Sequence, residues 1–117
     1  MILALVDDLM FRSKIKSTAQ QAGVVVTFAG SRDAALAAMR ASAPSLVIFD
    51  LNNVRADPLG TLAEMKTDAT LASIPTVGFV SHVDVTTIDA ARAAGVDDVV
   101  ARSAFAARLA ELLSRAG

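Results

Sequence analysis

Carboxylate side chains stand directly after two apolar runs of this sequence. Asp7 and Asp8 follow the run at 2–6, and Asp50 follows the run at 46–49. An ionised carboxylate beside an apolar run is costly unless it meets a partner or water. If the three acids converge, they repel one another and favour a hard divalent cation with oxygen ligands, for which Mg2+ is the best fit. An aspartate beside such a cation can also act as a covalent phosphoryl acceptor.

A structural interpretation of the same residues is also open. Aspartate and asparagine are common turn residues, and a lone aspartate at the end of a strand is usually only that. Three acids at the ends of two neighbouring strands favour the functional interpretation, provided that the two strands lie side by side. The choice therefore depends on the elements that position Asp7, Asp8 and Asp50.

Five short apolar segments alternate with five alanine-rich helical patterns. The expected strands are 2–6, 24–28, 45–49, 75–80 and 98–101. The expected helices run from about Leu9 to Ala22, after an N-cap at Ser31, after Asp57-Pro58, from about Asp84 to a stop at Gly95, and after an N-cap at Ser103. This alternation predicts an α/β fold, a doubly wound five-stranded parallel sheet with helices on both faces. Ligands of such sheets bind at the carboxyl ends of the strands, where the acids stand.

Length and composition predict one soluble domain spanning residues 1–117. The chain is 54% hydrophobic with a formal net charge of -1 and no cysteine. It therefore lacks the concentrated positive charge of a nucleic-acid surface and cannot form disulfides or thiolate metal sites. Its apolar runs are far shorter than the ~20 residues of a membrane span, and no signal peptide is evident, so we expect a cytoplasmic location and no membrane partner.

Four segments resemble the receiver domain of two-component response regulators, and the resemblance extends over nearly the whole length of the chain. They are ILALVDD, PSLVIFDLNN, IPTVGFVS and AAGVDDVVARS. The resemblance implies a flavodoxin-like (βα)5 fold with strand order 2-1-3-4-5. It also implies that Asp50 is the phosphoacceptor and that Mg2+ is bound by Asp7, Asp8, Asp50 and the backbone carbonyl of Asn52.

The sequence departs from the receiver pattern on the other side of the expected pocket. Val80 occupies the place of the hydroxyl residue that binds the phosphoryl group, and Ser81 comes one residue late. A shift of one residue turns a strand side chain to the opposite face, so Ser81 can serve only if the strand bulges or its end curls. Arg102 replaces the strand-five lysine and keeps its charge, whereas Ser103 replaces a proline and Val99 an aromatic residue.

These departures leave three functional hypotheses. The first is a stand-alone atypical receiver of a phosphorelay, with Ser81, His82 and Arg102 as substitute phosphoryl contacts. A histidine kinase or phosphotransfer protein would phosphorylate it, and it would signal by docking to an unknown downstream protein. The second is a pseudo-receiver that binds partners without phosphate. The third, a small Mg2+-dependent phosphatase-like enzyme, ranks last because no clear general base or lid is evident; we expect no enzyme.

The resemblance also predicts a surface for a possible homodimer. Receivers often dimerise through the face formed by helix four, strand five and helix five. Four charged residues of this chain fall on or beside that face and could form pairs between subunits: Arg92, Asp97, Asp98 and Arg102. Exposed pairs of this kind are usually only solvated charge.

Overall fold

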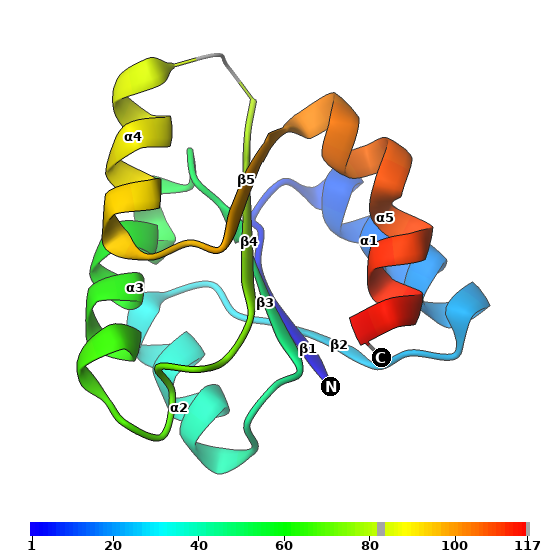
Figure 1. Ribbon diagram of the computed structural model, residues 1–117. Helices are drawn as coiled ribbons and strands as arrows, with labels where there is room; N and C mark the ends of the chain where they lie inside the picture. The colour runs from blue at the N-terminus through cyan, green and yellow to red at the C-terminus, as the bar shows by residue number, and fades with distance from the viewer. Residues whose placement is uncertain (82–83, 117) are drawn as a thin grey trace.

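A five-stranded parallel sheet runs through the centre of the protein, whose computed structural model describes residues 1–81 and 84–116 (Figure 1). The strands are β1 (Ile2–Leu5), β2 (Val26–Phe28), β3 (Leu46–Asp50), β4 (Thr76–Val80) and β5 (Asp98–Ala101). Their order is β2-β1-β3-β4-β5, and all four neighbouring pairs are parallel. The predicted fold class and strand order are confirmed.

Five helices cover the two faces of the sheet. They are α1 (Leu9–Ala22), α2 (Arg32–Ala41), α3 (Pro58–Thr67), α4 (Val85–Ala94) and α5 (Arg102–Ala116), and a short 3-10 turn, η1 (Val54–Ala56), precedes α3. Helices α1 and α5 pack on one face, and α2, α3 and α4 pack on the other (Figure 1). Within the described residues, no helix has both the length and the apolar character needed to cross a membrane.

Most of the predicted helix starts are confirmed by capping hydrogen bonds. The side chains of Ser31, Asp57 and Asp84 each accept a bond from a backbone N–H in the first turn of the following helix. The predicted cap at Ser103 is wrong. Strand β5 passes directly into α5 at Arg102, so Ser103 already lies in the first helical turn.

The expected second strand is shorter than its sequence pattern. Gly23 ends α1 in the left-handed conformation, with a φ of 70°. The N–H of Val24 then donates to the carbonyl of Ala19, 2.9 Å away, so this residue completes the helix end and does not enter the sheet. Strand β2 therefore begins two residues later, at Val26.

Alternate residues of the central strands supply two separate cores. Phe49 points into an aliphatic core beneath α2, α3 and α4, and Ile48 points into the core beneath α1 and α5. The second core holds the rings of Phe11, Phe79 and Phe105, with centroids 5.0 Å apart for the first two and 4.9 Å for the last two. Because both faces of β3 are buried, its sequence is a continuous apolar run rather than an alternating one.

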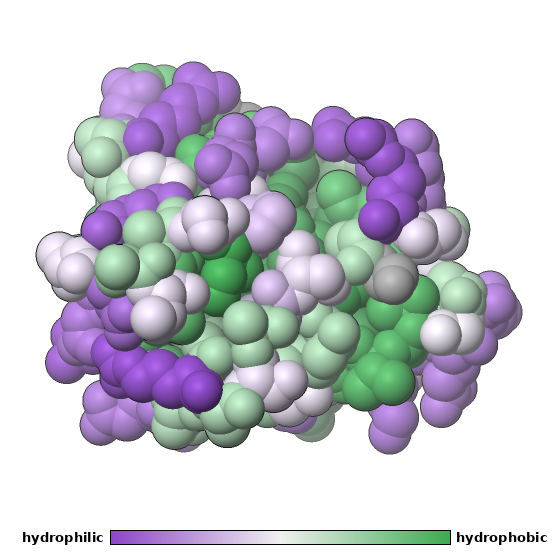
Figure 2. Space-filling view, turned by 60° about the horizontal axis from the view of Figure 1, so that its bottom comes forward, coloured by the Kyte–Doolittle hydropathy of each residue, from purple (hydrophilic) through white to green (hydrophobic). Residues whose placement is uncertain are grey.

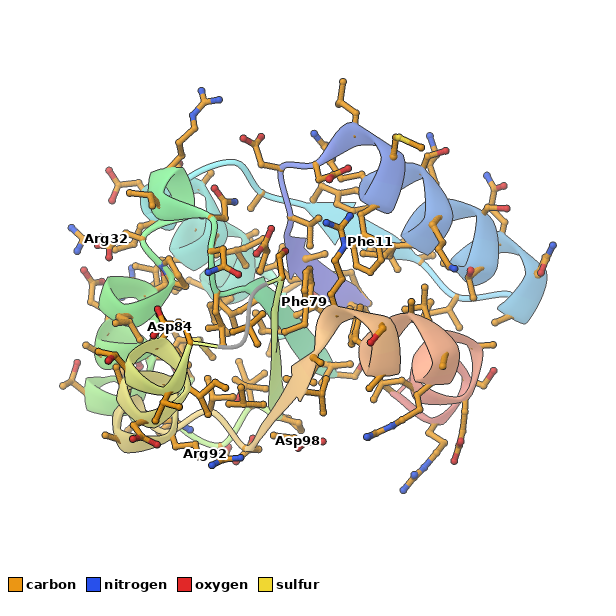
Figure 3. The ribbon with its side chains drawn as sticks, turned by 90° about the horizontal axis from the view of Figure 1, so that it is seen from above. Phe11, Arg32, Phe79, Asp84, Arg92 and Asp98 are labelled. Atoms are coloured by element: carbon orange, nitrogen blue, oxygen red, sulfur yellow. The ribbon has the colours of Figure 1, made fainter. Side chains whose placement is uncertain are left out.

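The two ends of the sheet differ in character. Figure 2 looks toward the end where the strands begin, where pale and apolar residues cover much of the middle and hydrophilic residues lie mainly around the margin. Figure 3 looks down on the opposite end, where the strands finish. The acidic residues singled out in the sequence follow the strands at this second end, as expected for a parallel sheet.

Candidate functional site

Asp50 is the last residue of β3 and lies half-buried at the carboxyl end of the sheet. Its Oδ1 accepts a hydrogen bond from the N–H of Asn52 at 3.0 Å. Burial raises the pKa of Asp50, and the nearby charges of Asp8 and Asp7 raise it further. The Asn52 N–H and the positive charge of Arg102 act in the opposite direction, but the pKa remains above its usual value. Both acids after β1 are thus close enough to act on the Asp50 carboxyl.

Asp8 has two bonds of its own. Its Oδ1 caps α1 by accepting from the N–H of Phe11 at 3.0 Å, and its Oδ2 pairs with Nη2 of Arg102 at 3.1 Å. The Phe11 N–H, followed by the Arg102 bond, lowers the pKa of Asp8. Although both carboxyls belong to one cluster, the pKa of Asp50 is raised and the pKa of Asp8 is lowered.

Arg102 is held by two different contacts. Besides its bond to Asp8, its guanidinium carbon lies 4.5 Å from the centre of the Phe11 ring. A guanidinium over an aromatic face gains electrostatic attraction to the ring. Phe11 lies beside Phe79 between α1 and the sheet (Figure 3). Arg102 is therefore the cation of this cluster that the fold fixes from two sides.

Asp7 has a different cationic partner. Its Oδ2 lies 3.4 Å from Nη1 of Arg55, which belongs to η1, the short turn between β3 and α3. The Arg55 side chain is 81% exposed, so the pair is solvated and weak in energy. Each of the two acids after β1 thus meets a guanidinium from another part of the chain.

The predicted metal ligands have suitable donor chemistry but other partners in this structure. Carboxylates of Asp7, Asp8 and Asp50 with the carbonyl of Asn52 form an oxygen set that suits Mg2+. However, arginines occupy two of the acids, and the Asn52 carbonyl accepts from the N–H of Val54 at 3.1 Å. Over residues 1–81 and 84–116, no three acidic or histidine side chains stand in an arrangement that could hold a metal ion. The donors fit a divalent cation only if the guanidinium groups move away.

At the end of β4, the side chains of Val80 and Ser81 lie in different surroundings. The Val80 side chain is 3% exposed and packs in the core beneath α2, α3 and α4. Ser81 is exposed, and its N–H donates to Oδ1 of Asn52 at 2.7 Å, which ties the ends of β3 and β4 together. An open hollow of about 500 Å³ on the α1–α5 side is lined by Phe11, Val80, Ser81, Ala101, Arg102, Ser103 and Ala106. Ser81 and Arg102 therefore share a hollow, whereas His82 lies outside the described residues.

The sequence matches no protein-family model and no curated protein. Its structure is similar to the receiver domain of NtrX from Brucella abortus, with a TM-score of 0.82 and 27% identity over 99% of this chain and 97% of that one. This chain has the receiver fold of response regulators. Two further receivers with this fold are the phosphorylated cyanobacterial phytochrome response regulator RcpA (24% identity, TM-score 0.81) and the Mn2+-bound response regulator Rcp1 (20%, 0.78). Each match covers 97% of this chain and 88% of the other.

Three features of this chain were not anticipated from its sequence. Arg55 reaches Asp7 across 48 positions of sequence, and no local pattern around it signals that contact. Asn52 acts through its side-chain oxygen on β4, whereas only its backbone carbonyl was expected to have a role. Asn53 is 7% exposed, and its Nδ2 has no hydrogen-bond partner among the described residues. A buried donor left without a partner is expected where water, an ion or a ligand completes a site.

Three of the four charged residues proposed for a dimer surface have partners within the chain. Asp97 accepts from the N–H and the hydroxyl of Thr76, at 2.8 and 3.2 Å, and so joins the turn before β5 to β4. Asp98 pairs with Arg108 at 3.3 Å, and Arg102 pairs with Asp8. These three side chains therefore have partners within one chain, and both the pairs between subunits and the homodimer remain predictions.

Proposed function

We propose that this receiver accepts a phosphoryl group on Asp50 from a phosphohistidine of a histidine kinase or phosphotransfer protein, and that it signals by docking to another protein. The observation that carries the proposal is the position of Asp50, half-buried at the end of β3, with Asp7, Asp8 and Arg102 all acting on its carboxyl. A charged side chain in that setting has a perturbed pKa because of burial and specific neighbours, which is typical of functional sites.

The transfer itself needs only one nucleophile from this chain. A carboxylate oxygen of Asp50 attacks the phosphorus, the P–N bond breaks, and the electron pair leaves on the imidazole nitrogen. Arg102 supplies positive charge near the transferred group, and the exposed Ser81 lies in the same hollow. Asp7, Asp8, Asp50 and the Asn52 carbonyl would hold Mg2+, which offsets the negative charge gathered during transfer. The phosphorylated and Mn2+-bound receivers of the same fold support this assignment.

Intact-mass measurement after incubation with acetyl phosphate and Mg2+ tests the proposal. We expect the wild-type chain to gain the mass of one phosphoryl group and Asp50→Ala to gain none. Asp98→Asn is the matched control, because it removes an exposed carboxylate that pairs with Arg108 outside the acid cluster. The proposal is wrong if wild type gains no mass or if Asp50→Ala gains as much as wild type.

One observation favours a second function, a phosphate-independent docking module. The Val80 side chain is 3% exposed and packs in the core beneath α2, α3 and α4, and the resemblance to receivers implies that a phosphoryl-binding hydroxyl stands at this position in that family. A receiver without that hydroxyl can keep the fold and its surfaces while losing the response to phosphate. Absence of the mass gain, in a protein that unfolds cooperatively in urea, would favour this function over the first.

A further inference from the structure

Two arginines pair with the acids that follow β1. Arg102 meets Asp8 from the start of α5, and Arg55 meets Asp7 from η1. The two arginines differ in the number of other contacts that hold them in place. Arg102 also stacks on Phe11, whereas Arg55 is exposed and has no other ion-pair partner among the described residues. Arg55 is therefore the cation that can leave the cluster most easily.

We propose that Arg55 competes with a divalent cation for Asp7, and that occupancy of the acid cluster is thereby coupled to the position of η1. This inference rests on the proposed function, because it takes Asp7 as one of the cation ligands. It concerns Arg55, which is not one of the proposed cation ligands. It also assigns η1 as the element whose position depends on whether a cation is bound.

The competition follows from charge. A guanidinium 3.4 Å from the Asp7 oxygen stands close to any cation that the same carboxylate binds, and the two positive charges repel. Binding of the cation therefore weakens the Arg55 contact, and the contact weakens binding by the same factor. The neighbouring Asp8 and Asp50 do not remove this repulsion, because Arg102 already offsets part of their charge.

The position of η1 makes it a suitable reporter. Its first residue, Val54, is 87% exposed, whereas its last residue, Ala56, is fully buried. The next residue, Asp57, has a φ of 46°, caps α3 and pairs with Arg32 of α2 at 3.3 Å. Arg55 thus lies in the exposed middle of a short turn whose flanking residues, Asn53 and Ala56, are buried, so its movement acts on the part of η1 beside the start of α3.

A hollow beside η1 offers a surface through which the change could be read. It measures about 310 Å³, and its walls come from the end of β3, η1, the start of α3 and one side of α4: Leu51, Val54, Asp57, Pro58, Leu59, Thr86, Thr87 and Ala90. Val54, the residue before Arg55, lines this hollow. This route lies away from Val80 and Val99, where the hydroxyl and aromatic groups of the family pattern are missing.

Binding of Mn2+, followed by electron paramagnetic resonance, tests the competition directly. We expect Arg55→Gln to bind Mn2+ about three- to tenfold more tightly than wild type at low salt, from the repulsion of a single and a double charge roughly 7 Å apart in water. Arg55→Lys keeps the charge and should bind nearly as wild type does. Arg108→Gln is the matched control, since it removes an arginine from another exposed pair, and should change the affinity less than twofold.

Amide chemical shifts provide the second readout. Adding Mg2+ to wild type should shift the amides of Val54, Ala56 and Asp57, and in Arg55→Gln the metal-free spectrum of these residues should already lie toward the Mg2+-bound position. Equal Mn2+ affinity in wild type, Arg55→Gln and Arg108→Gln overturns the inference and leaves the proposed function standing if Asp50 still gains a phosphoryl group. If no variant binds Mn2+ and Asp50 gains no mass, the inference and the proposed function both fail.

Discussion

Charged side chains gather at the ends of β1 and β3, whereas mostly apolar side chains stand at the ends of β4 and β5. The first pair gathers three carboxylates, each with a bond to a guanidinium or to a backbone N–H. The second pair presents Val80 to the core and a half-buried Val99, with Arg102 as its one contribution to the charged cluster within the described residues. Three acids therefore stand at the ends of β1 and β3, beside strand ends whose residues are mostly apolar.

This difference shows which part of such a site tolerates change. The acids stand at exposed or half-buried positions, where water and arginines compensate their charge, so they fit the fold whether or not phosphate arrives. A side chain at position 80 has no such freedom, because it lies in a core. Once that position is apolar, packing favours keeping it so.

The largest effect should come from returning a hydroxyl to the apolar half. Val80→Thr buries a hydroxyl in the core of α2, α3 and α4 at nearly unchanged volume. If this hydroxyl has no hydrogen-bond partner, the free energy of unfolding of the Val80→Thr protein should be lower than that of wild type by about 1–2 kcal/mol. Urea unfolding measures this, with Val99→Thr at a half-buried site as the smaller-loss control. A fully stable Val80→Thr protein would mean that the hydroxyl finds a partner, and the contrast between the halves would weaken.

Removing the charge of Asp50 should have an effect of opposite sign. The folded pKa of Asp50 is raised, so the folded chain holds this proton more strongly than the unfolded chain, and ionised Asp50 lowers stability above its ordinary pKa. Asp50→Asn should therefore gain roughly 1 kcal/mol at pH 7 in chelator, and the gain should vanish as the pH falls below about 4.

Magnesium should reverse that order if the acids form one cation site. A cation that binds only the native cluster stabilises by mass action, and more so in wild type than in Asp50→Asn. Urea melts at ~10 mM Mg2+, chosen to saturate a weak site, measure the reversal. If Asp50→Asn is the less stable protein in chelator and magnesium moves neither midpoint, the three carboxylates do not act as one site.

A smaller effect with the opposite pH dependence is expected at Asp8. The folded pKa of Asp8 is lowered by the Phe11 N–H and by Arg102, so its ionised form stabilises the fold above its ordinary pKa and loses this effect as the pH falls through the folded value. Asp8→Asn keeps a capping oxygen but removes the charge, so it should be less stable than wild type at pH 7 and equal to it in strong acid. Stability curves against pH for Asp8→Asn and Asp50→Asn should therefore differ from wild type with opposite slopes.

The smallest effect concerns the link between the two halves. Arg102 lowers the pKa of Asp50 through its charge, so Arg102→Gln should raise that pKa further while the fold stays intact. Carbon-detected titration of the aspartate side chains measures it. An unchanged Asp50 titration in Arg102→Gln would show that the second half contributes nothing to the charge of the first.

The local sequence determined most of the architecture. The alternation of apolar runs and alanine-rich helices was enough to predict the parallel sheet, because both patterns depend on neighbours a few residues apart. The caps at Ser31 and Asp57 were predicted for the same reason, since each bonds a backbone N–H three positions ahead. The cap at Ser103 was not, because α5 follows β5 with no connecting residue.

The parallel topology also placed the acids at one edge, but only the tertiary structure decided their partners. Asp8 meets Arg102 across 94 positions, Asp7 meets Arg55 across 48, and Asn52 meets Ser81 across 29. No local pattern encodes such pairs, because they depend on where the loops after three different strands finish and which way each side chain turns. The sequence alone therefore determined a sheet with acids at its carboxyl edge, and the folded chain decided that arginines, from η1 and the start of α5, stand beside two of them.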